Sequence, residues 1–236
     1  MTDFNYDSIP SGYYDTIYKK NEGVQSKWHI LKFRFFQQHI LATDKLLDIG
    51  CGPGTFLGNF SQYDSAVGID ISEAQIDYAT EHYATEQRTF SAFSGTTLPF
   101  EDASFDAVTL IEVIEHVSPE VVANLFNEAF RVLKPGGRLY VSTPNYGSLW
   151  PLLEKIVNAK AEVTYDEQHI NLFKRKRLQS ELISAGFNQV DLRAYQFAAP
   201  FAACLNWTLA DKIYELEKGV FSSRIGFLLF ATGSKP

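Results

Sequence analysis

The stretch that decides the fold is Leu46-Leu47-Asp48-Ile49-Gly50-Cys51-Gly52-Pro53-Gly54. It joins a short apolar run, with an acid near its end, to three glycines at alternate positions. We interpret it as a buried strand that breaks into a tight loop. Glycine tolerates unusual backbone angles and lets the main chain approach a ligand closely. The stretch therefore predicts a cradle for a small molecule at the end of a strand.

The composition favours one globular α/β domain in the cytoplasm. The chain has 236 residues, of which 45% are hydrophobic, and these suffice for a sizeable core. The formal net charge of −7 counts against a general nucleic-acid binder, because phosphate recognition needs a concentrated positive surface. Cys51 and Cys204 are the only cysteines, which excludes a disulfide framework and a four-cysteine zinc site. No apolar run approaches the roughly 20 residues of a membrane span, so we expect none.

Strand-like and helix-like segments alternate along the chain. After the opening strand, we expect strands at 65–70, 88–93, 106–111, 138–143, 187–195 and 225–232. The expected helices are 24–41, 56–63, 73–83, 119–133, 149–157, 177–185 and 200–216. This alternation implies a mostly parallel sheet with right-handed crossovers. We predict a single domain over 1–236, with a helical cap (1–42), a cofactor-binding core (43–144) and substrate-side elements with the last strands (145–236).

Two families place glycines after the first strand and an acid after the second. Nicotinamide enzymes do so with the pattern G-x-G-x-x-G, but Thr55 stands where that pattern needs its third glycine. The stretch Leu47–Gly54 instead resembles the first motif of class I S-adenosylmethionine-dependent methyltransferases, in particular the ubiquinone-pathway O-methyltransferase-like (methyltransferase type 11) group. The likeness continues, in order, through Gly68-Ile69-Asp70-Ile71-Ser72, Leu98-Pro99-Phe100 with Phe105-Asp106, and Arg131-Val132-Leu133-Lys134-Pro135-Gly136-Gly137.

The resemblance implies a Rossmann-like fold with a seven-stranded, mostly parallel sheet, its last strand antiparallel, flanked by helices. It also implies S-adenosylmethionine as cofactor, with Asp48, Gly50 and Gly52 around the methionine part and Asp70 on the ribose hydroxyls. A carboxylate can accept two hydrogen bonds from a vicinal diol, and charge-assisted bonds are the stronger kind. The remaining expected cofactor contacts are Cys51, Ile71, Ser94 and Ile111. Ser94 lies in the segment where many relatives carry an aspartate that contacts adenine.

Glu112, Glu115 and His116 follow the fourth expected strand. At i, i+3 and i+4 they share one face if the segment is helical. They resemble the Glu-x-x-Glu-His of ubiquinone-pathway O-methyltransferases and small-RNA 2′-O-methyltransferases, which implies a divalent cation. His169, in Asp166–Asn171, could complete a set suited to magnesium, manganese or zinc. Without a metal, Glu112 would lie near the cofactor, Glu115 would be a buried hydrogen-bonding group and His116 would face the substrate.

Methyl transfer to a hydroxyl requires alignment and removal of a proton, so His116 and His169 are the candidate catalytic bases. The favoured function is methylation of a small-molecule hydroxyl. RNA 2′-O-methylation is one alternative, and the basic run Lys174–Arg177 would then contact the anion instead of forming a solvated helix start. A protein that binds S-adenosylmethionine without transferring its methyl group is the other. The sequence leaves open the acceptor and the oligomeric state.

Overall fold

The computed structural model describes residues 9–158, 169–217 and 225–236. These residues form two compact units. The glycine-loop unit contains residues 9–94 and 196–217. The histidine unit contains residues 95–158, 169–195 and 225–236. The predicted single domain over the whole chain stays a prediction.

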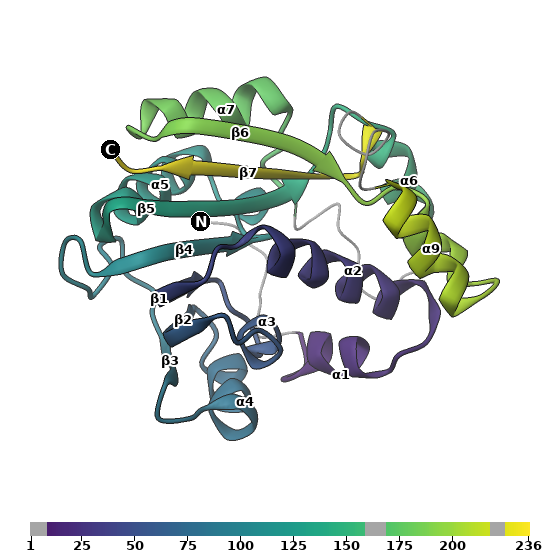
Figure 1. Cartoon of the computed structure of the whole chain (residues 1–236), viewed down its shortest axis with the longest axis horizontal. Coiled ribbons are helices and arrows are strands. Elements are labelled where there is room, and N and C mark those ends of the chain that lie inside the picture. The colour runs from purple at the N-terminus through teal and green to yellow at the C-terminus, as the bar shows by residue number, and fades with distance from the viewer. Residues whose placement is uncertain (1–8, 159–168, 218–224) are drawn as a thin grey trace. The chain divides into compact units, whose positions relative to one another are not determined.

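Three parallel strands form the sheet of the glycine-loop unit, with the order β3-β2-β1 (Figure 1). They are β1 (Thr43–Ile49), β2 (Tyr63–Asp70) and β3 (Arg88–Ala92). Ile49 pairs with Ile69 and Asp70 with Ala92, so the three carboxyl ends lie at one edge. Two helices follow these ends, α3 (Thr55–Gly58) after β1 and α4 (Glu73–Tyr83) after β2. Loops at this edge connect each strand to its helix, which is where open α/β sheets bind ligands.

The first helix is anchored by a buried carboxylate. Helix α1 (Tyr13–Lys19) carries Asp15, whose side chain is fully buried. The hydroxyls of Tyr78 and Tyr83 on α4 donate to it at 2.8 and 2.5 Å, and the Lys19 ammonium lies 2.8 Å away. Burial raises the pKa of Asp15, but the bonds from Lys19, Tyr83 and Tyr78 outweigh it and leave the pKa lowered. Asp15 therefore stabilises the packing of α1 on α4 as an anion.

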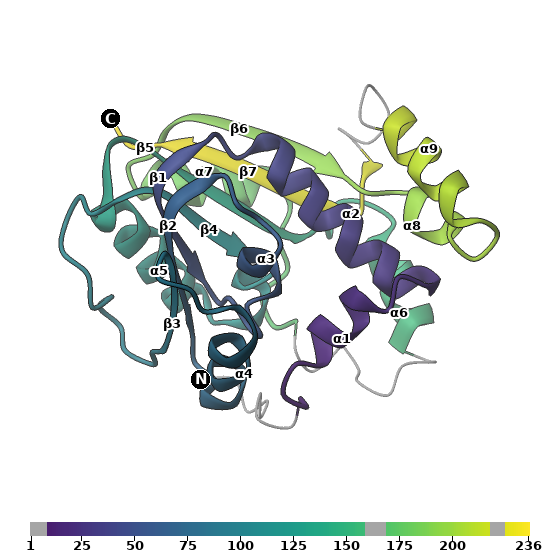
Figure 2. The same ribbon diagram turned by 60° about the horizontal axis from the view of Figure 1, so that its bottom comes forward.

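Helix α2 (Gly23–His39) packs against two short helices from late in the chain. These are α8 (Ala199–Ala202) and α9 (Trp207–Glu217), which lie together beside α2 (Figure 2). Leu31, Ala199 and Tyr214 form their buried apolar contact. The Nζ of Lys27 and the Nη1 of Arg34 lie 2.9 and 2.7 Å from the two carboxylate oxygens of Asp211. Residues more than 160 positions apart in the sequence therefore build one helical layer.

The histidine unit contains four strands in the order β4-β5-β7-β6. They are β4 (Phe105–Ile111), β5 (Leu133–Pro144), β6 (Asn188–Tyr195) and β7 (Leu228–Ser234). β4 and β5 are parallel, whereas β7 is antiparallel to both β5 and β6. Helix α5 (Pro119–Val132) connects β4 to β5, and the Ser118 hydroxyl caps it by accepting from the Val121 N–H. Helices α6 (Trp150–Asn158) and α7 (Arg175–Ser184) follow β5, and α7 lies along β6 and β7 (Figure 1).

The seven strands have the order β3-β2-β1-β4-β5-β7-β6. This order and the antiparallel pairs of β7 confirm the predicted seven-stranded, mostly parallel sheet with an antiparallel last strand. The flanking helices confirm the α/β class.

Two predicted helices have the wrong bounds, and one helix has no predicted bounds. The helix expected at 56–63 is the single turn α3, because Asn59 turns its side chain back to the Thr55 carbonyl and β2 already begins at Tyr63. The helix expected at 200–216 is broken into α8, which ends at Ala202, and α9, which Asn206 caps by accepting from the Leu209 N–H. The helix without predicted bounds is α1, which lies within the predicted helical cap (1–42) ahead of the helix expected at 24–41.

Candidate functional site

The glycine loop wraps the end of β2. The N–H groups of Gly50 and Cys51 both donate to the Ile69 carbonyl, at 2.8 and 3.0 Å. Gly54 has a φ of +74°, and a Cβ there would lie 2.9 Å from both Ala79 and Phe90. Only glycine fits this position, because the left-handed backbone and the close packing both exclude a side chain. The loop is therefore fixed against β2 and directs its backbone to the carboxyl edge of the strands.

Asp70 is held by the same loop. The Gly52 N–H donates to its Oδ2 at 2.8 Å and the Ser72 N–H to its Oδ1 at 3.0 Å. Burial raises the pKa of the Asp70 carboxyl, and bonds from the backbone at Ser72, Gly52 and Ile71 oppose that shift. An ionised carboxylate has about four lone-pair sites, and these two bonds occupy one on each oxygen. Acceptor capacity beyond the backbone bonds therefore remains for a ligand.

The other predicted cofactor residues in this unit differ in exposure. Asp48 and Cys51 are buried, with 2% and 7% of their surface exposed. Burial raises the pKa of the Cys51 thiol well above its usual range, and the charges of Asp48 and Asp70 raise it further. Cys51 is therefore a neutral packing residue and no nucleophile. Ile71 and Ser94 are exposed; Ile71 follows β2 directly and Ser94 lies two residues beyond β3.

In the histidine unit, β4 ends at Ile111 and the chain turns sharply at Glu112. Glu112 has a φ of +57°, which is uncommon for a residue other than glycine. Two bonds to β5 hold it there: its N–H donates to the Ser142 carbonyl at 3.1 Å, and the Ser142 hydroxyl donates to its Oε1 at 2.7 Å. Strained backbone of this kind is typical of functional sites.

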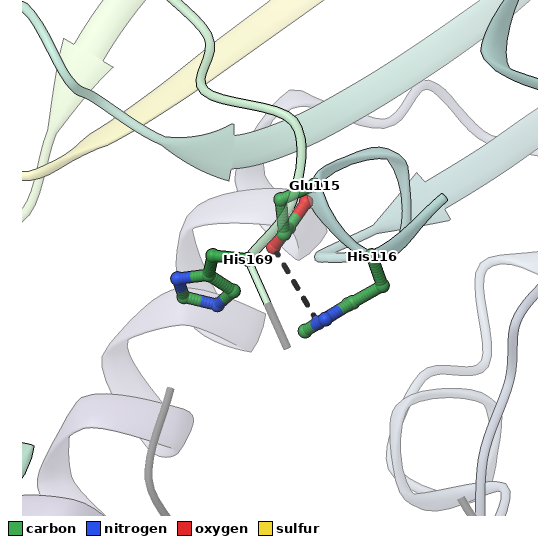
Figure 3. A group of neighbouring side chains, drawn as sticks. All are labelled: Glu115, His116 and His169. Carbon is green, nitrogen blue, oxygen red and sulfur yellow. Dashed lines mark ion pairs between the residues drawn. The ribbon is translucent and has the colours of Figure 1, made fainter. Parts of the chain in front are cut away.

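Glu112, Glu115 and His116 would share one face only if their segment were helical, and that condition is not met. A 3₁₀ turn, η2, covers only Ile114–His116, and Glu112 lies outside it with a left-handed backbone that interrupts helical spacing. Glu115 and His116 are adjacent in this turn, with the Nε2 of His116 3.9 Å from the Oε1 of Glu115 (Figure 3). The Glu115 side chain is 1% exposed.

His169 joins the turn from a distant part of the sequence. The N–H groups of Ile170 and Asn171 donate to the Glu115 carbonyl at 3.0 and 3.1 Å. His169 thereby comes close to His116, with ring centroids 5.1 Å apart. Ligand atoms of Glu115, His116 and His169 all lie within 4.8 Å of one another (Figure 3). The remainder of its predicted motif, residues 166–168, lies outside the described residues.

Sequence reasoning missed two partners of His169. The Tyr146 hydroxyl donates to the Glu154 carboxylate at 2.7 and 3.0 Å, and the Nδ1 of His169 bonds both side chains. Burial raises the pKa of Glu154, whereas the bonds from His169 and Tyr146 leave it lowered. Burial and the Glu154 charge raise the pKa of the Tyr146 phenol, which stays protonated. No sequence motif pairs these residues, which lie 8, 15 and 23 positions apart.

The methyltransferase domain family matches residues 47–141, from the end of β1 into β5. Together with the fold, this match confirms the resemblance drawn from the sequence: residues 47–141 match a methyltransferase domain, within a sheet of the predicted seven-stranded order. No helix in the described parts of the chain is long and apolar enough to cross a membrane.

Particular relatives differ in how much of the chain they share. A demethylmenaquinone methyltransferase of Clavibacter sepedonicus is 28% identical over 231 residues, 91% of this chain and 88% of the relative. A 27-O-demethylrifamycin SV methyltransferase of Amycolatopsis mediterranei is 36% identical over 104 residues, 42% of this chain and 38% of the relative. The chain spans 32% and 41% of the lengths of two further curated relatives.

A solved methyltransferase has the same fold. The crystal structure is that of a SAM-dependent methyltransferase from Thermotoga maritima, with a TM-score of 0.66 and 18% identity, and the match covers 90% of this chain and 91% of that one. At this identity the likeness establishes the fold alone.

Proposed function

We propose that this protein transfers a methyl group from S-adenosylmethionine to a hydroxyl oxygen of a small molecule. The domain match supports the methyl donor. The observation that carries the acceptor is the pair of His116 and His169, with ring centroids 5.1 Å apart in a half-buried setting. An imidazole near neutral pH can remove the proton that a hydroxyl must lose as it is methylated.

The glycine-loop unit would hold the donor. The Asp70 carboxylate retains acceptor capacity beyond its backbone bonds, which suits a ribose hydroxyl group. The loop backbone at Gly50 and Gly52 would approach the methionine part, as the resemblance implies. Ile71 offers an exposed apolar side chain next to Asp70, and we assign it to the adenine ring together with Ser94. The donor residues thus come from the ends of β1, β2 and β3.

The histidine unit would hold the acceptor. When bound, S-adenosylmethionine supplies a methyl carbon activated by the adjacent sulfonium. His116 or His169 would accept the proton that the acceptor hydroxyl loses as it is methylated. The name of the rifamycin relative includes an oxygen acceptor, and the names of both relatives indicate small molecules. These names support the class of acceptor that we propose.

The predicted divalent cation fits three of its four predicted ligands. Glu115, His116 and His169 lie close enough together to share an ion, and one carboxylate with two imidazoles suits zinc or manganese. Glu112 is absent from this group, and its carboxylate accepts from Ser142. The cation stays a prediction and takes no part in the proposed step. Calorimetric titration with zinc and manganese, using His169→Ala as the comparison, would test it.

The RNA alternative draws no support from the basic run. Arg175 donates to the Leu192 carbonyl, and Arg177 pairs with Glu181 at 2.8 Å and lies over the Phe173 ring. Two of the four cations in the run are thus engaged within the histidine unit. We therefore retain RNA only as an outcome of the test.

The test is transfer of a labelled methyl group into fractionated cell extract, followed by mass spectrometry of the product. We expect a small molecule labelled on oxygen. His116→Ala should lower turnover far more than affinity for S-adenosylmethionine, and His82→Ala, an exposed histidine on α4, serves as the control.

Three results would contradict the proposal. A product labelled on nitrogen or carbon would refute the hydroxyl acceptor, and a labelled RNA would favour the alternative enzyme. Binding of S-adenosylmethionine without any labelled product would favour a binding protein that lacks transferase activity.

A further inference from the structure

Three side chains meet at His169, each from a different segment. Tyr146 lies just past β5, Glu154 lies on α6, and His169 lies ahead of α7. The side chains of Glu154 and His169 are 8% and 5% exposed. The Tyr146 oxygen lies 2.7 Å from the Oε1 of Glu154 and 2.9 Å from the Nδ1 of His169. A carboxylate, a phenol and an imidazole therefore form one closed hydrogen-bonded group.

For a neutral His169 ring, the donors and acceptors of this group can be arranged in only one favourable way. The Glu154 carboxylate is an acceptor, so both groups that touch its Oε1 must donate. Tyr146 has a single hydroxyl proton, which it gives to Glu154. The Nδ1 of His169 must then carry a proton, because a bare ring nitrogen would set its lone pair against the carboxylate oxygen. The group thus selects the Nδ1–H form of the His169 ring.

This choice determines which atom His169 presents on its other side. With Nδ1 bound to Glu154, the basic nitrogen of the neutral ring is Nε2. Figure 3 shows one ring nitrogen of His169 on the side of Glu115 and His116 and the other pointing away from them. The backbone bonds from Ile170 and Asn171 to the Glu115 carbonyl fix the position of the ring relative to that pair. Nε2 therefore faces the space that His169 shares with His116.

We propose that Glu154 is a positioning residue that holds His169 in the Nδ1–H tautomer, so that its Nε2 faces the acceptor hydroxyl, with Tyr146 keeping the carboxylate in place. The inference rests on the proposed methyl transfer to oxygen and deepens it, since it selects the reacting nitrogen. Carboxylates that orient metal-ligating histidines contribute about 10- to 100-fold to metal affinity or activity, and Glu154 would orient His169 in the same manner. We expect an effect of that size on kcat.

The test combines nitrogen-15 NMR of the histidine rings with steady-state kinetics. The chain has five histidines, and the spectrum of His169→Ala identifies the signals of His169. Wild-type protein should show the Nδ1–H tautomer. Glu154→Leu removes the acceptor and should shift the ring toward the Nε2–H tautomer, with kcat about 10- to 100-fold lower and the KM for S-adenosylmethionine within about twofold.

Two further variants separate positioning from folding. Glu154→Gln keeps an amide oxygen that can accept from Nδ1–H, so it should retain the tautomer and recover part of kcat. Glu181→Leu, which removes a carboxylate on α7 that pairs with Arg177, is the matched control and should leave tautomer and kcat unchanged. If Glu154→Leu fails to fold, the wild-type tautomer and the Glu154→Gln variant still decide the question.

The Nε2–H tautomer in wild-type protein would overturn the proposal, and so would an unchanged tautomer and kcat in folded Glu154→Leu. The NMR measurement needs no substrate. If wild-type protein transfers no methyl group to oxygen, the proposed function fails, whereas the tautomer still shows whether Glu154 orients His169.

Discussion

Replacing Asp70 by asparagine should weaken the binding of S-adenosylmethionine by about 10- to 150-fold. In the wild type, the two carboxylate oxygens accept backbone N–H groups from Gly52 at 2.8 Å and from Ser72 at 3.0 Å, and on our proposal the carboxylate also accepts from the ribose. Asparagine has one acceptor oxygen, so one N–H would face an amide NH₂ group and one hydroxyl would lose its acceptor. A hydrogen bond to a charged group contributes about 1.5–3 kcal/mol, and 1.4 kcal/mol is about tenfold in affinity.

The assay is calorimetric titration with S-adenosylhomocysteine and with an analogue that lacks both ribose hydroxyls. If Asp70 binds the ribose, Asp70→Asn should strongly weaken the binding of S-adenosylhomocysteine and weaken the binding of the analogue by less than about threefold. Comparing the two losses is a double-mutant cycle, which isolates the contact between Asp70 and the ribose hydroxyls. Asp64→Asn, an exposed change of equal charge on the same strand β2, is the control. An equal loss for both ligands would refute the ribose contact and would mean that Asp70 acts by holding the loop.

Three further changes test the packing around the two units. Gly54→Ala should lower the free energy of unfolding by about 1–3 kcal/mol more than Gly52→Ala. Both glycines have a positive φ, but of the two only Gly54 lacks room for a Cβ. Urea denaturation measures the two losses, and equal losses would contradict the prediction. Asp15→Asn should cost about 1.5–3 kcal/mol near neutral pH. The pKa of Asp15 is lower in the folded than in the unfolded protein. Its contribution to the free energy of unfolding is therefore fully present above about pH 4, the unfolded pKa, and is lost as the pH falls through the folded pKa. If the difference in stability between Asp15→Asn and wild type does not shrink in acid, this reasoning is wrong. Arg131→Lys should lower the melting temperature, since its guanidinium bonds two carboxylates and two backbone carbonyls in a geometry that lysine cannot reproduce; an unchanged melting temperature would count against it.

The sheet could be predicted from the sequence because its strands are short apolar runs between turn signals. Leu46 and Leu47 are fully buried in β1, and the glycines after them end the strand where the motif predicts. The break between α8 and α9 was not predictable in the same way, because both sides of it have helix-forming residues. Asn206 caps the start of α9. A single asparagine inside an apolar helical pattern is only a weak sequence signal for a helix start.

The candidate site divides into a part that local sequence specifies and a part that tertiary contacts specify. Asp70 and the glycine loop contact each other through backbone N–H groups near in the sequence, so a motif can encode them. Glu112 takes a left-handed backbone because Ser142, thirty positions away, bonds it twice, and no local pattern could reveal that.

The same backbone turn at Glu112 explains why the expected helical face around His116 does not exist. Because the turn ends regular spacing, Glu112 bonds β5 while Glu115 and His116 face His169. The orientation of His169 then depends on Glu154 and Tyr146, which belong to the least patterned third of the chain. If Glu112, Glu115 and His116 had shared a helical face, that one segment would have fixed the positions of the three side chains relative to one another. The observed arrangement instead lets α6 and the segment before α7 set the geometry of the histidine pair. Differences in acceptor among such proteins should therefore map to those segments, and exchange of α6 between two of them would be expected to change His169 without changing the binding of the methyl donor.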